Sequence, residues 1–360
     1  MARVLGWLAG LVAALALAFA IAERIPAVQD AVMRAAIGHL VASDNDSLYG
    51  DDGLRVLVCG TASPLPHPSR AKACVAVFAG GRYWVVDTGP GSANRLGLLR
   101  VDPTRIAGVL LTHFHSDHIG DLGELNLNTW AGGRPEALRV YGPPGVERVT
   151  AGFNEAYALD TSYRVLHHGA DFMIPEREAL VPQPIPGPAE TGAPVVVLEE
   201  NGLRITAFRV KHDPVKPAYG YRFDYKGRSV VVSGDTAKSD SLIAAAKGAD
   251  VLLHEAQANH LVAMIGEAAA AHGRPRVAKI MHDIPSYHTS PVEAAESANE
   301  AGVKLLVLYH LTPSPRFGVM ERVFVRGVAD VRKGDWTLAD DGLLIELPAG
   351  SAEVRTSQLE

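Results

Sequence analysis

The sequence predicts an α/β protein, with β-sheets in the middle and helices outside. From residue 54 onward, short apolar runs of β type alternate with longer segments of helical character. Glycine and proline separate these runs, as they do between the elements of a mixed fold. Hydrophobic residues make up 48% of the 360-residue chain and charged residues 21%, so the composition supports a sizeable core.

The expected strands are short and are bounded by turn residues. They cover Leu54–Cys59, Cys74–Ala79, Tyr83–Asp87, Ile106–Thr112, Leu138–Tyr141, Leu203–Lys211, Ala218–Tyr225, Ser229–Ser233, Val251–His254 and Lys304–Tyr309. The expected helices cover His118–Trp130, Val146–Ala158, Ser239–Lys247, Leu261–Ala271 and Pro291–Ala301. Ser290 and Glu293 form a capping box before the last of these. The proline-rich stretch 181–194 is expected to be a surface loop.

The N-terminus carries a long apolar run that is separate from this pattern. Nineteen apolar or small residues, Val4–Ala22, follow Arg3. As a helix the run would be about 28 Å long, enough to span a bilayer. It ends in Ala-Ile-Ala at 20–22, a candidate cleavage site. Residues 1–22 therefore predict a signal peptide or a retained transmembrane anchor. Either one would export the chain, as a periplasmic or an outward-facing membrane-anchored protein.

Residues 23–53 are expected to link this run to the body. An amphipathic helix over 27–41 and the polar stretch Ser43–Ser47 predict a stalk, and the compact domain is expected over 54–360. Cys59 and Cys74 either pair in an oxidising compartment or remain two buried thiols. The net charge of −6 gives the chain no general attraction to nucleic acid.

The segment with the most chemical information reads LTHFHSDHIGD, over residues 111–121. It follows an expected strand and opens an expected helix. His113 and His115 are two residues apart, so both imidazoles point the same way from extended backbone. Asp117 and His118 follow where the chain turns. Three imidazoles and a carboxylate within six residues suit zinc.

This motif resembles the His-x-His-x-Asp-His signature of the metallo-β-lactamase superfamily. Four further segments match the family in order, namely Asp87-Thr-Gly89, His212, Ser233-Gly-Asp-Thr236 and His310. The resemblance covers residues 54–312 and implies a four-layer αββα sandwich with a dinuclear metal site at the edge of its sheets. It implies two Zn²⁺, with Mn²⁺ or Fe²⁺ as alternatives. His113, His115 and His212 would hold one ion; Asp117, His118 and His310 would hold the other, with Asp235 between them.

Within the superfamily, the sequence most resembles ribonuclease Z and its relatives. The resemblance is carried by Cys59–Ser63, by Val251–Ala256 and by Tyr287-His-Thr-Ser290. In that group the histidine of the last segment lies near the scissile phosphate. The resemblance therefore implies His288 as a general acid, with Asp117 as the second catalytic residue. Four residues are expected to support the ligands and His288 from behind: Asp87, Asp121, His254 and Glu255.

These residues predict an exported dinuclear zinc hydrolase of the ribonuclease Z-like or arylsulfatase type. It would cleave a phosphodiester or a sulfate ester by attack of a metal-bound hydroxide. Ribonuclease Z usually carries an extended arm that grips tRNA, whereas here Gly220–Ser229 leaves room only for a tight turn. The missing arm, the acidic charge and the predicted export favour a small-molecule ester as substrate and argue against nucleic acid as a partner. A tRNA 3′-processing endoribonuclease and a lactonase or β-lactamase are the alternatives.

Overall fold

The computed structural model describes residues 7–8, 12, 15–17, 19–42, 45–49, 53–187 and 193–359. The chain divides into two units, Met1–Asn45 and Asp46–Glu360. In the first, α2 (Pro26–Ala42) is the helix expected over 27–41. Part of the apolar run Val4–Ala22, and Ser43 and Asp44 of the polar stretch, lie outside the described residues. No described helix is both long and apolar enough to cross a membrane, and the signal peptide or anchor remains a prediction.

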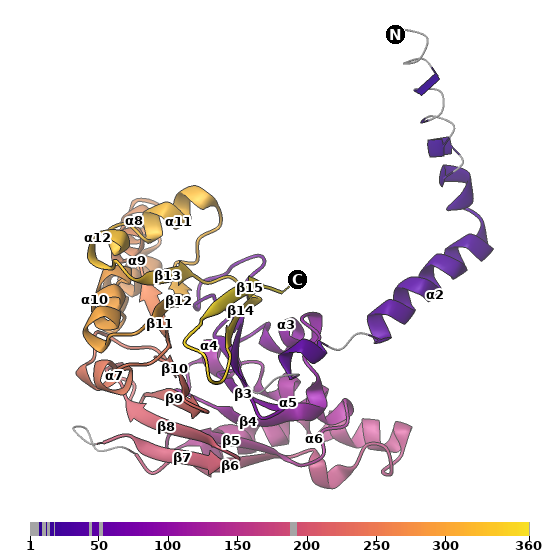
Figure 1. Cartoon of the computed structure of the whole chain (residues 1–360), viewed down its shortest axis with the longest axis horizontal. Helices are drawn as coiled ribbons and strands as arrows, with labels where there is room; N and C mark the ends of the chain where they lie inside the picture. Colours follow the sequence, from indigo (N-terminus) through magenta and orange to yellow (C-terminus); the bar gives the residue numbers. More distant parts are fainter. Residues whose placement is uncertain are drawn as a thin grey trace. The chain divides into compact units, whose positions relative to one another are not determined.

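In the second unit, the described residues form two β-sheets, one of eight strands and one of seven (Figure 1). The first has the order β15-β14-β1-β2-β3-β4-β5-β6 and the second β13-β12-β11-β10-β9-β8-β7. The strands of the first sheet are β1 (Leu54–Gly60), β2 (Cys74–Ala79), β3 (Arg82–Val86), β4 (Ile106–Leu110), β5 (Leu138–Gly142), β6 (Leu180–Pro184), β14 (Leu343–Leu347) and β15 (Arg355–Gln358). Those of the second are β7 (Val195–Glu200), β8 (Leu203–Arg209), β9 (Tyr219–Tyr225), β10 (Arg228–Val232), β11 (Val251–Gln257), β12 (Leu305–Thr312) and β13 (Asp335–Leu338).

The main hydrophobic core lies between the two sheets and takes side chains from both. Val56 and Val77 of the first sheet belong to the same buried cluster as Tyr221 and Leu253 of the second. Strands such as β1 and β11 are buried along their whole length, because each sheet is covered on both faces. Their sequences are therefore continuous apolar runs rather than alternating ones.

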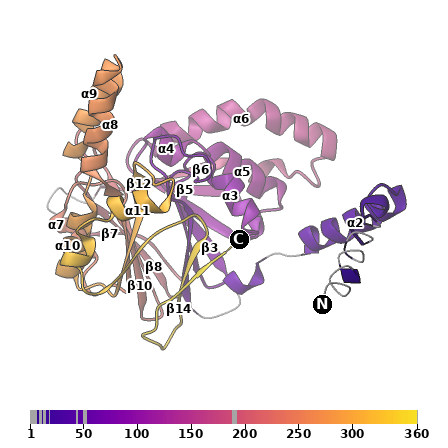
Figure 2. The same cartoon turned by 90° about the horizontal axis from the view of Figure 1, so that it is seen from above.

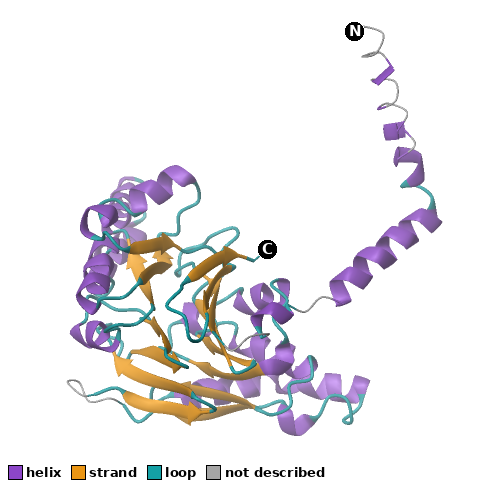
Figure 3. Cartoon of the chain, in the orientation of Figure 1, coloured by secondary structure: helices purple, strands orange, loops and turns teal. Residues whose placement is uncertain are grey.

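Helices cover the outer faces of both sheets (Figure 3). Those described in the second unit are α3 (Ser92–Leu98), α4 (Ser116–Ile119), α5 (Leu122–Ala131), α6 (Val146–His168), α7 (Asp240–Ala245), α8 (Asn259–Ala271), α9 (Pro275–Asp283), α10 (Pro291–Ala301), α11 (Gly318–Phe324) and α12 (Val328–Val331). One buried cluster joins α3, α5 and α6 to the first sheet, and another joins α7, α10 and α11 to the second. The predicted α/β class and the four-layer αββα arrangement are confirmed.

The structure differs from the expected elements at two segments and agrees at a third. The helix expected over His118–Trp130 is interrupted, because α4 ends at Ile119 and α5 begins at Leu122. The prediction of a loop over 181–194 is wrong for its first residues. Pro182 and Pro184 belong to β6, which forms an edge of the first sheet. Proline is tolerated in an edge strand, where one row of backbone groups needs no partner. The turn between β9 and β10 is tight, with Lys226 and Gly227 both at positive φ, as expected.

Cys59 and Cys74 form a disulfide, which settles the pairing that the sequence leaves open. Cys59 lies in β1 and Cys74 begins β2, and these antiparallel strands are neighbours. Gly60 is the register partner of Cys74, so the two cysteines come together directly through strand pairing. The cross-link closes a loop of 15 residues, which contains the connection between β1 and β2.

The Cys59→Ala/Cys74→Ala double variant should lose roughly 3 kcal/mol of unfolding free energy, the value typical of a 15-residue loop. Urea denaturation followed by circular dichroism measures it. Dithiothreitol should move the midpoint of the wild-type chain toward that of the variant and leave the variant where it is. Identical midpoints for the oxidised wild type and the variant would contradict a stabilising cross-link.

Candidate metal centre

The residues expected to bind metal meet at one edge of the two sheets, where several strands end. His113, His115, Asp117 and His118 follow β4, His212 follows β8, Asp235 follows β10, and His310 lies within β12. All of them are buried except His115, which is exposed. Segments from both sheets thus contribute to a single cluster, which no local stretch of sequence could assemble alone.

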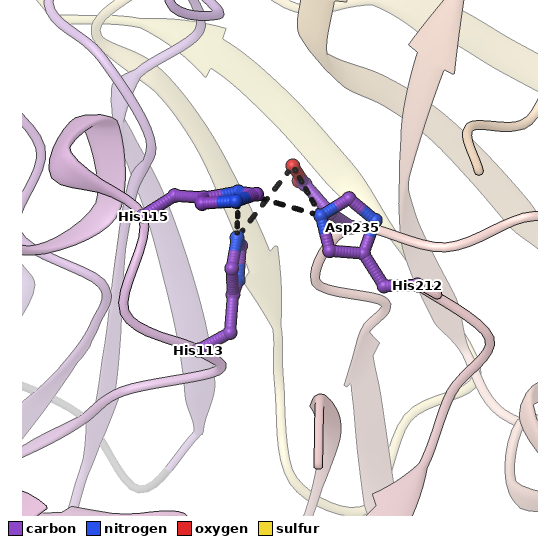
Figure 4. A group of neighbouring side chains, drawn as sticks. All are labelled: His113, His115, His212 and Asp235. Atoms are coloured by element: carbon purple, nitrogen blue, oxygen red, sulfur yellow. Dashed lines mark hydrogen bonds and ion pairs between the residues drawn. The ribbon is translucent and has the colours of Figure 1, made fainter. Parts of the chain in front are cut away.

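The first group of ligands consists of His113, His115, His212 and Asp235. One donor atom from each lies within 4.8 Å of the others. His113 Nε2 is 2.9 Å from His115 Nδ1, and His212 Nε2 is 3.4 Å from the same His115 atom. Figure 4 shows the three imidazoles and the carboxylate turned toward one another. This convergence of donor atoms is what a single cation requires.

The second group consists of Asp117, His118 and His310, whose donor atoms also lie within 4.8 Å of one another. Asp117 Oδ2 is 3.2 Å from His310 Nε2 and 3.6 Å from His118 Nε2. Asp235 reaches both groups. Its Oδ2 is 3.9 Å from His113 Nε2 and 3.4 Å from His118 Nε2. The carboxylate therefore stands where a ligand shared by two cations would stand.

Unpaired atoms in this cluster fit a bound cation. His118 Nε2, Asp235 Oδ1 and His310 Nδ1 are buried and form no hydrogen bond within the described part of the chain. Buried polar atoms nearly always form hydrogen bonds. Three such atoms without a hydrogen bond in one cluster therefore indicate a partner other than protein. Imidazole and carboxylate donors suit Zn²⁺, Mn²⁺ and Fe²⁺. The residues present thus fit two divalent metal ions.

The protonation states of most ligands also suit metal binding. Burial lowers the pKa of His113 and His212, which keeps both imidazoles neutral. Burial alone would raise the pKa of Asp117, but His118 and His310 outweigh it and hold that pKa at about 2. Burial opposes charge on His118 too, yet Asp235 and other carboxylates raise its pKa well above the usual value. Metal binding must therefore displace a proton from His118.

Asp87 holds the histidine segment from behind, as expected. Its Oδ2 lies 2.8 Å from His118 Nδ1 and accepts a hydrogen bond from Thr112 Oγ1, while its Oδ1 accepts one from the Thr112 backbone N–H. Asp87 has φ +59°, an unusual value for a residue with a side chain. Gly89 follows at a place where a Cβ would lie 2.1 Å from the Asp117 carbonyl oxygen. The Asp-Thr-Gly motif thus supports the histidine segment of the metal centre by hydrogen bonds and close backbone packing.

His288 and Glu255 form a buried pair beside the ligands. Glu255 Oε1 lies 2.8 Å from His288 Nδ1 and accepts a hydrogen bond from the Thr236 backbone N–H. Burial would lower the pKa of His288, but Glu255 outweighs it and raises that pKa to about 9. His288 lines a pocket of about 280 Å³ together with the ligands His115, Asp117 and Asp235. The imidazole therefore faces the same space as the metal centre.

Two predicted supporting residues play other parts. Asp121 accepts a hydrogen bond from the Ala93 backbone N–H, so it supports the start of α3 instead of a ligand. His254 is buried, with Nδ1 2.7 Å from the Glu255 carbonyl oxygen, and no described contact joins it to the seven ligands. The role of Tyr287 was not predicted. Its carbonyl oxygen lies 3.1 Å from His212 Nδ1 and leaves Nε2 for the metal side. A backbone carbonyl leaves no signal in a sequence.

Comparison with known proteins shows the family to which this chain belongs. A family model described as "Beta-lactamase superfamily domain" matches residues 82–311. The chain belongs to the metallo-β-lactamase superfamily. Ribonuclease Z of Mycobacterium bovis is 35% identical over 264 residues, which cover 72% of this chain and 87% of the relative. Ribonuclease Z of Mycolicibacterium gilvum is 33% identical over the same share of this chain and 85% of its own. The chain therefore belongs to the ribonuclease Z-like group of these hydrolases.

Solved structures share the fold of this superfamily member. The metallo-β-lactamase fold protein YhfI from Bacillus subtilis superposes with a TM-score of 0.59 at 22% identity, over 82% of this chain and 100% of that one. The short form of human tRNase Z gives a TM-score of 0.54 at 22% identity, over 82% and 99% of the two chains. The second unit thus has the metallo-β-lactamase fold.

The relatives overturn one expectation. The expectation of a small-molecule ester as substrate, with nucleic acid unlikely as a partner, is wrong, because the matched relatives are ribonucleases by name. The expectation rested on the net charge and on the tight turn between β9 and β10. Neither property bears on which bond the centre cleaves. An overall charge of −6 also says nothing about the charge of one local surface.

Asp235→Ala should lower the metal content of both groups, because the carboxylate contacts ligands of each. We expect at least a tenfold loss of metal affinity, since even residues behind the ligands typically contribute that much. Metal analysis of the dialysed full-length chain measures it, with Asp330→Ala on α12 as an exposed control that keeps its metal. A variant at Asp235 that retained two equivalents would rule out the shared position.

Proposed function

We propose that the chain is a two-zinc phosphodiesterase that hydrolyses RNA. The observation that carries this proposal is the position of His288, which lines the same pocket as three metal-ligand candidates while Glu255 holds it from behind. The relatives named ribonuclease Z support RNA as the substrate. They also favour a phosphodiester over a sulfate ester, although both present a tetrahedral centre to the site.

The chemistry divides between the cations and the chain. Two divalent cations in this site would supply a nucleophile generated from water and neutralise charge on the phosphoryl oxygens. His288 supplies the proton. Glu255 occupies its Nδ1 side, so the opposite ring nitrogen is available to the pocket, and the raised pKa keeps the imidazole protonated at neutral pH. Donation of that proton to the departing ribose oxygen avoids release of an alkoxide.

His288→Ala should affect substrates according to their leaving groups. Cleavage of an RNA oligonucleotide should slow by roughly 10²- to 10⁴-fold, because a ribose alkoxide needs a proton to leave. Hydrolysis of bis(4-nitrophenyl) phosphate should fall by far less, since nitrophenolate leaves without one. Turnover numbers for both substrates and the metal content are measured together, with His167→Ala on α6 as an exposed control. Equal losses on both substrates would indicate that His288 binds the phosphate instead.

We also propose that residues 1–22 export the chain, either as a cleaved signal peptide or as a membrane anchor. The apolar run Val4–Ala22 and the Ala-Ile-Ala at its end support export. The disulfide between Cys59 and Cys74 supports it as well, because disulfides persist in oxidising compartments.

A fluorescent protein that folds only in the cytoplasm, fused to the C-terminus, should stay dark in cells that express the full chain. Deletion of residues 4–22 should make the same fusion bright, because the apolar run is the only part changed. Cell fractionation with an antibody against the body separates the exported chain from unexported material. A bright, soluble full-length fusion would refute the export proposal.

A further inference from the structure

Helices α8 and α9 form a hairpin that projects beyond the sheets, as Figure 2 shows. The two helices pack closely. Gly266 of α8 faces α9 at a point where a Cβ would lie 3.2 Å from the Cβ of Met281. Val262, Ala269 and Met281 are buried. The hairpin is thus a defined element with its own packing. None of the candidate metal ligands lies on it.

The base of this hairpin forms one wall of the pocket at the metal centre. Ile280 and Met281 of α9, with Ile284 directly after it, line the same pocket as the ligands His115, Asp117 and Asp235. Tyr287 and Leu65 also line this pocket. Ile280 is 53% exposed, so a large apolar side chain stands open to solvent beside a polar centre. A wall of this kind suits the flat apolar face of a nucleobase attached to the scissile phosphate.

The outer part of the hairpin carries two arginines that form no ion pair within the described residues. Arg274 and Arg276 are exposed, and neither forms an ion pair with any described residue. Lys279, one turn further on, pairs with Asp283. Both arginines sit at the beginning of α9, where the helix dipole disfavours positive charge. The hairpin therefore keeps two uncompensated cations at a cost to its own helix, which indicates an anionic partner outside the chain.

The arginines lie at a useful distance from the pocket. Arg276 precedes Ile280 by four residues, about 6 Å along a helix axis. A polymer that leaves the pocket along α9 would bring its next phosphates to the guanidinium groups. The tip itself, residues 271–276, reads AHGRPR and has no large apolar side chain. Insertion into a lipid bilayer needs such side chains, so the tip favours a phosphate-bearing polymer.

We propose that the α8–α9 hairpin is the RNA-binding arm of this hydrolase. Ile280 and Ile284 pack against the nucleobase next to the scissile phosphate, and Arg274 and Arg276 bind the phosphates that follow. The hairpin then does for this chain what the arm absent between β9 and β10 does in ribonuclease Z. This inference rests on the proposed function, because it takes RNA as the substrate.

The test uses the full-length, zinc-loaded chain with Arg274→Gln and Arg276→Gln combined. KM for a labelled single-stranded RNA should rise about tenfold while kcat stays within a factor of two. The slope of log KM against log salt should weaken by about 1.4, the value for two lost phosphate contacts on a single strand. The exposed pair Arg326→Gln/Lys333→Gln is the matched control and should leave both quantities unchanged. Ile280→Ala should raise KM for RNA more than KM for bis(4-nitrophenyl) phosphate.

The outcomes separate this inference from the proposed function. If the arginine variant cleaves RNA with the KM and salt slope of the wild type, the hairpin is not the arm and the proposed function stands. If the wild type hydrolyses bis(4-nitrophenyl) phosphate but not RNA, the proposed function fails and the inference with it. If the variant loses binding to phosphatidylglycerol vesicles and keeps its KM for RNA, the hairpin belongs to a membrane surface and the inference is overturned.

Discussion

The Asp235 carboxylate is the point on which the metal centre depends. It is buried and lies within 4 Å of four imidazoles, those of His113, His118, His212 and His310. Burial alone would favour its neutral form, but His310 and His118 outweigh burial and hold its pKa well below the usual value. A buried charge is tolerated only where opposite charges or metal ions surround it.

That requirement explains much of the architecture around the carboxylate. The four imidazoles come from segments that follow or lie within β4, β8 and β12, so both sheets must hold their strand ends in fixed positions. Two residues at this edge, Asp87 and His310, adopt positive φ although each has a side chain. Such conformations persist where the surrounding structure determines them, and they are concentrated at functional sites. The rigid double sheet therefore supplies the precision that the ligands need.

The fold class and four of the seven candidate ligands could be predicted from local signals. His212, Asp235 and His310 were assigned only through the resemblance to the superfamily. Buried strands read as apolar runs, and four donors crowd into six residues around His115. The hairpin α8–α9 shows the opposite case. Nothing in the sequence indicates that Ile280 lines the same pocket as Asp117, because this depends on how distant segments pack. The Tyr287 carbonyl is hidden for a similar reason, since backbone groups are alike at every residue. The edge strand β6 was not predicted, because its prolines indicate a loop unless its position in the sheet is known.

The order of the first sheet has a consequence for how the protein is made. Strand β1 lies between β2 and β14, and Leu54 pairs with Leu347 across nearly the whole chain. The Asp341 side chain, just before β14, also accepts hydrogen bonds from the Thr61 and Ala71 backbone N–H groups. The middle of this sheet cannot close until the ribosome has synthesised the segment that forms β14. Contacts so distant in sequence slow folding and leave the nascent chain open for most of its synthesis.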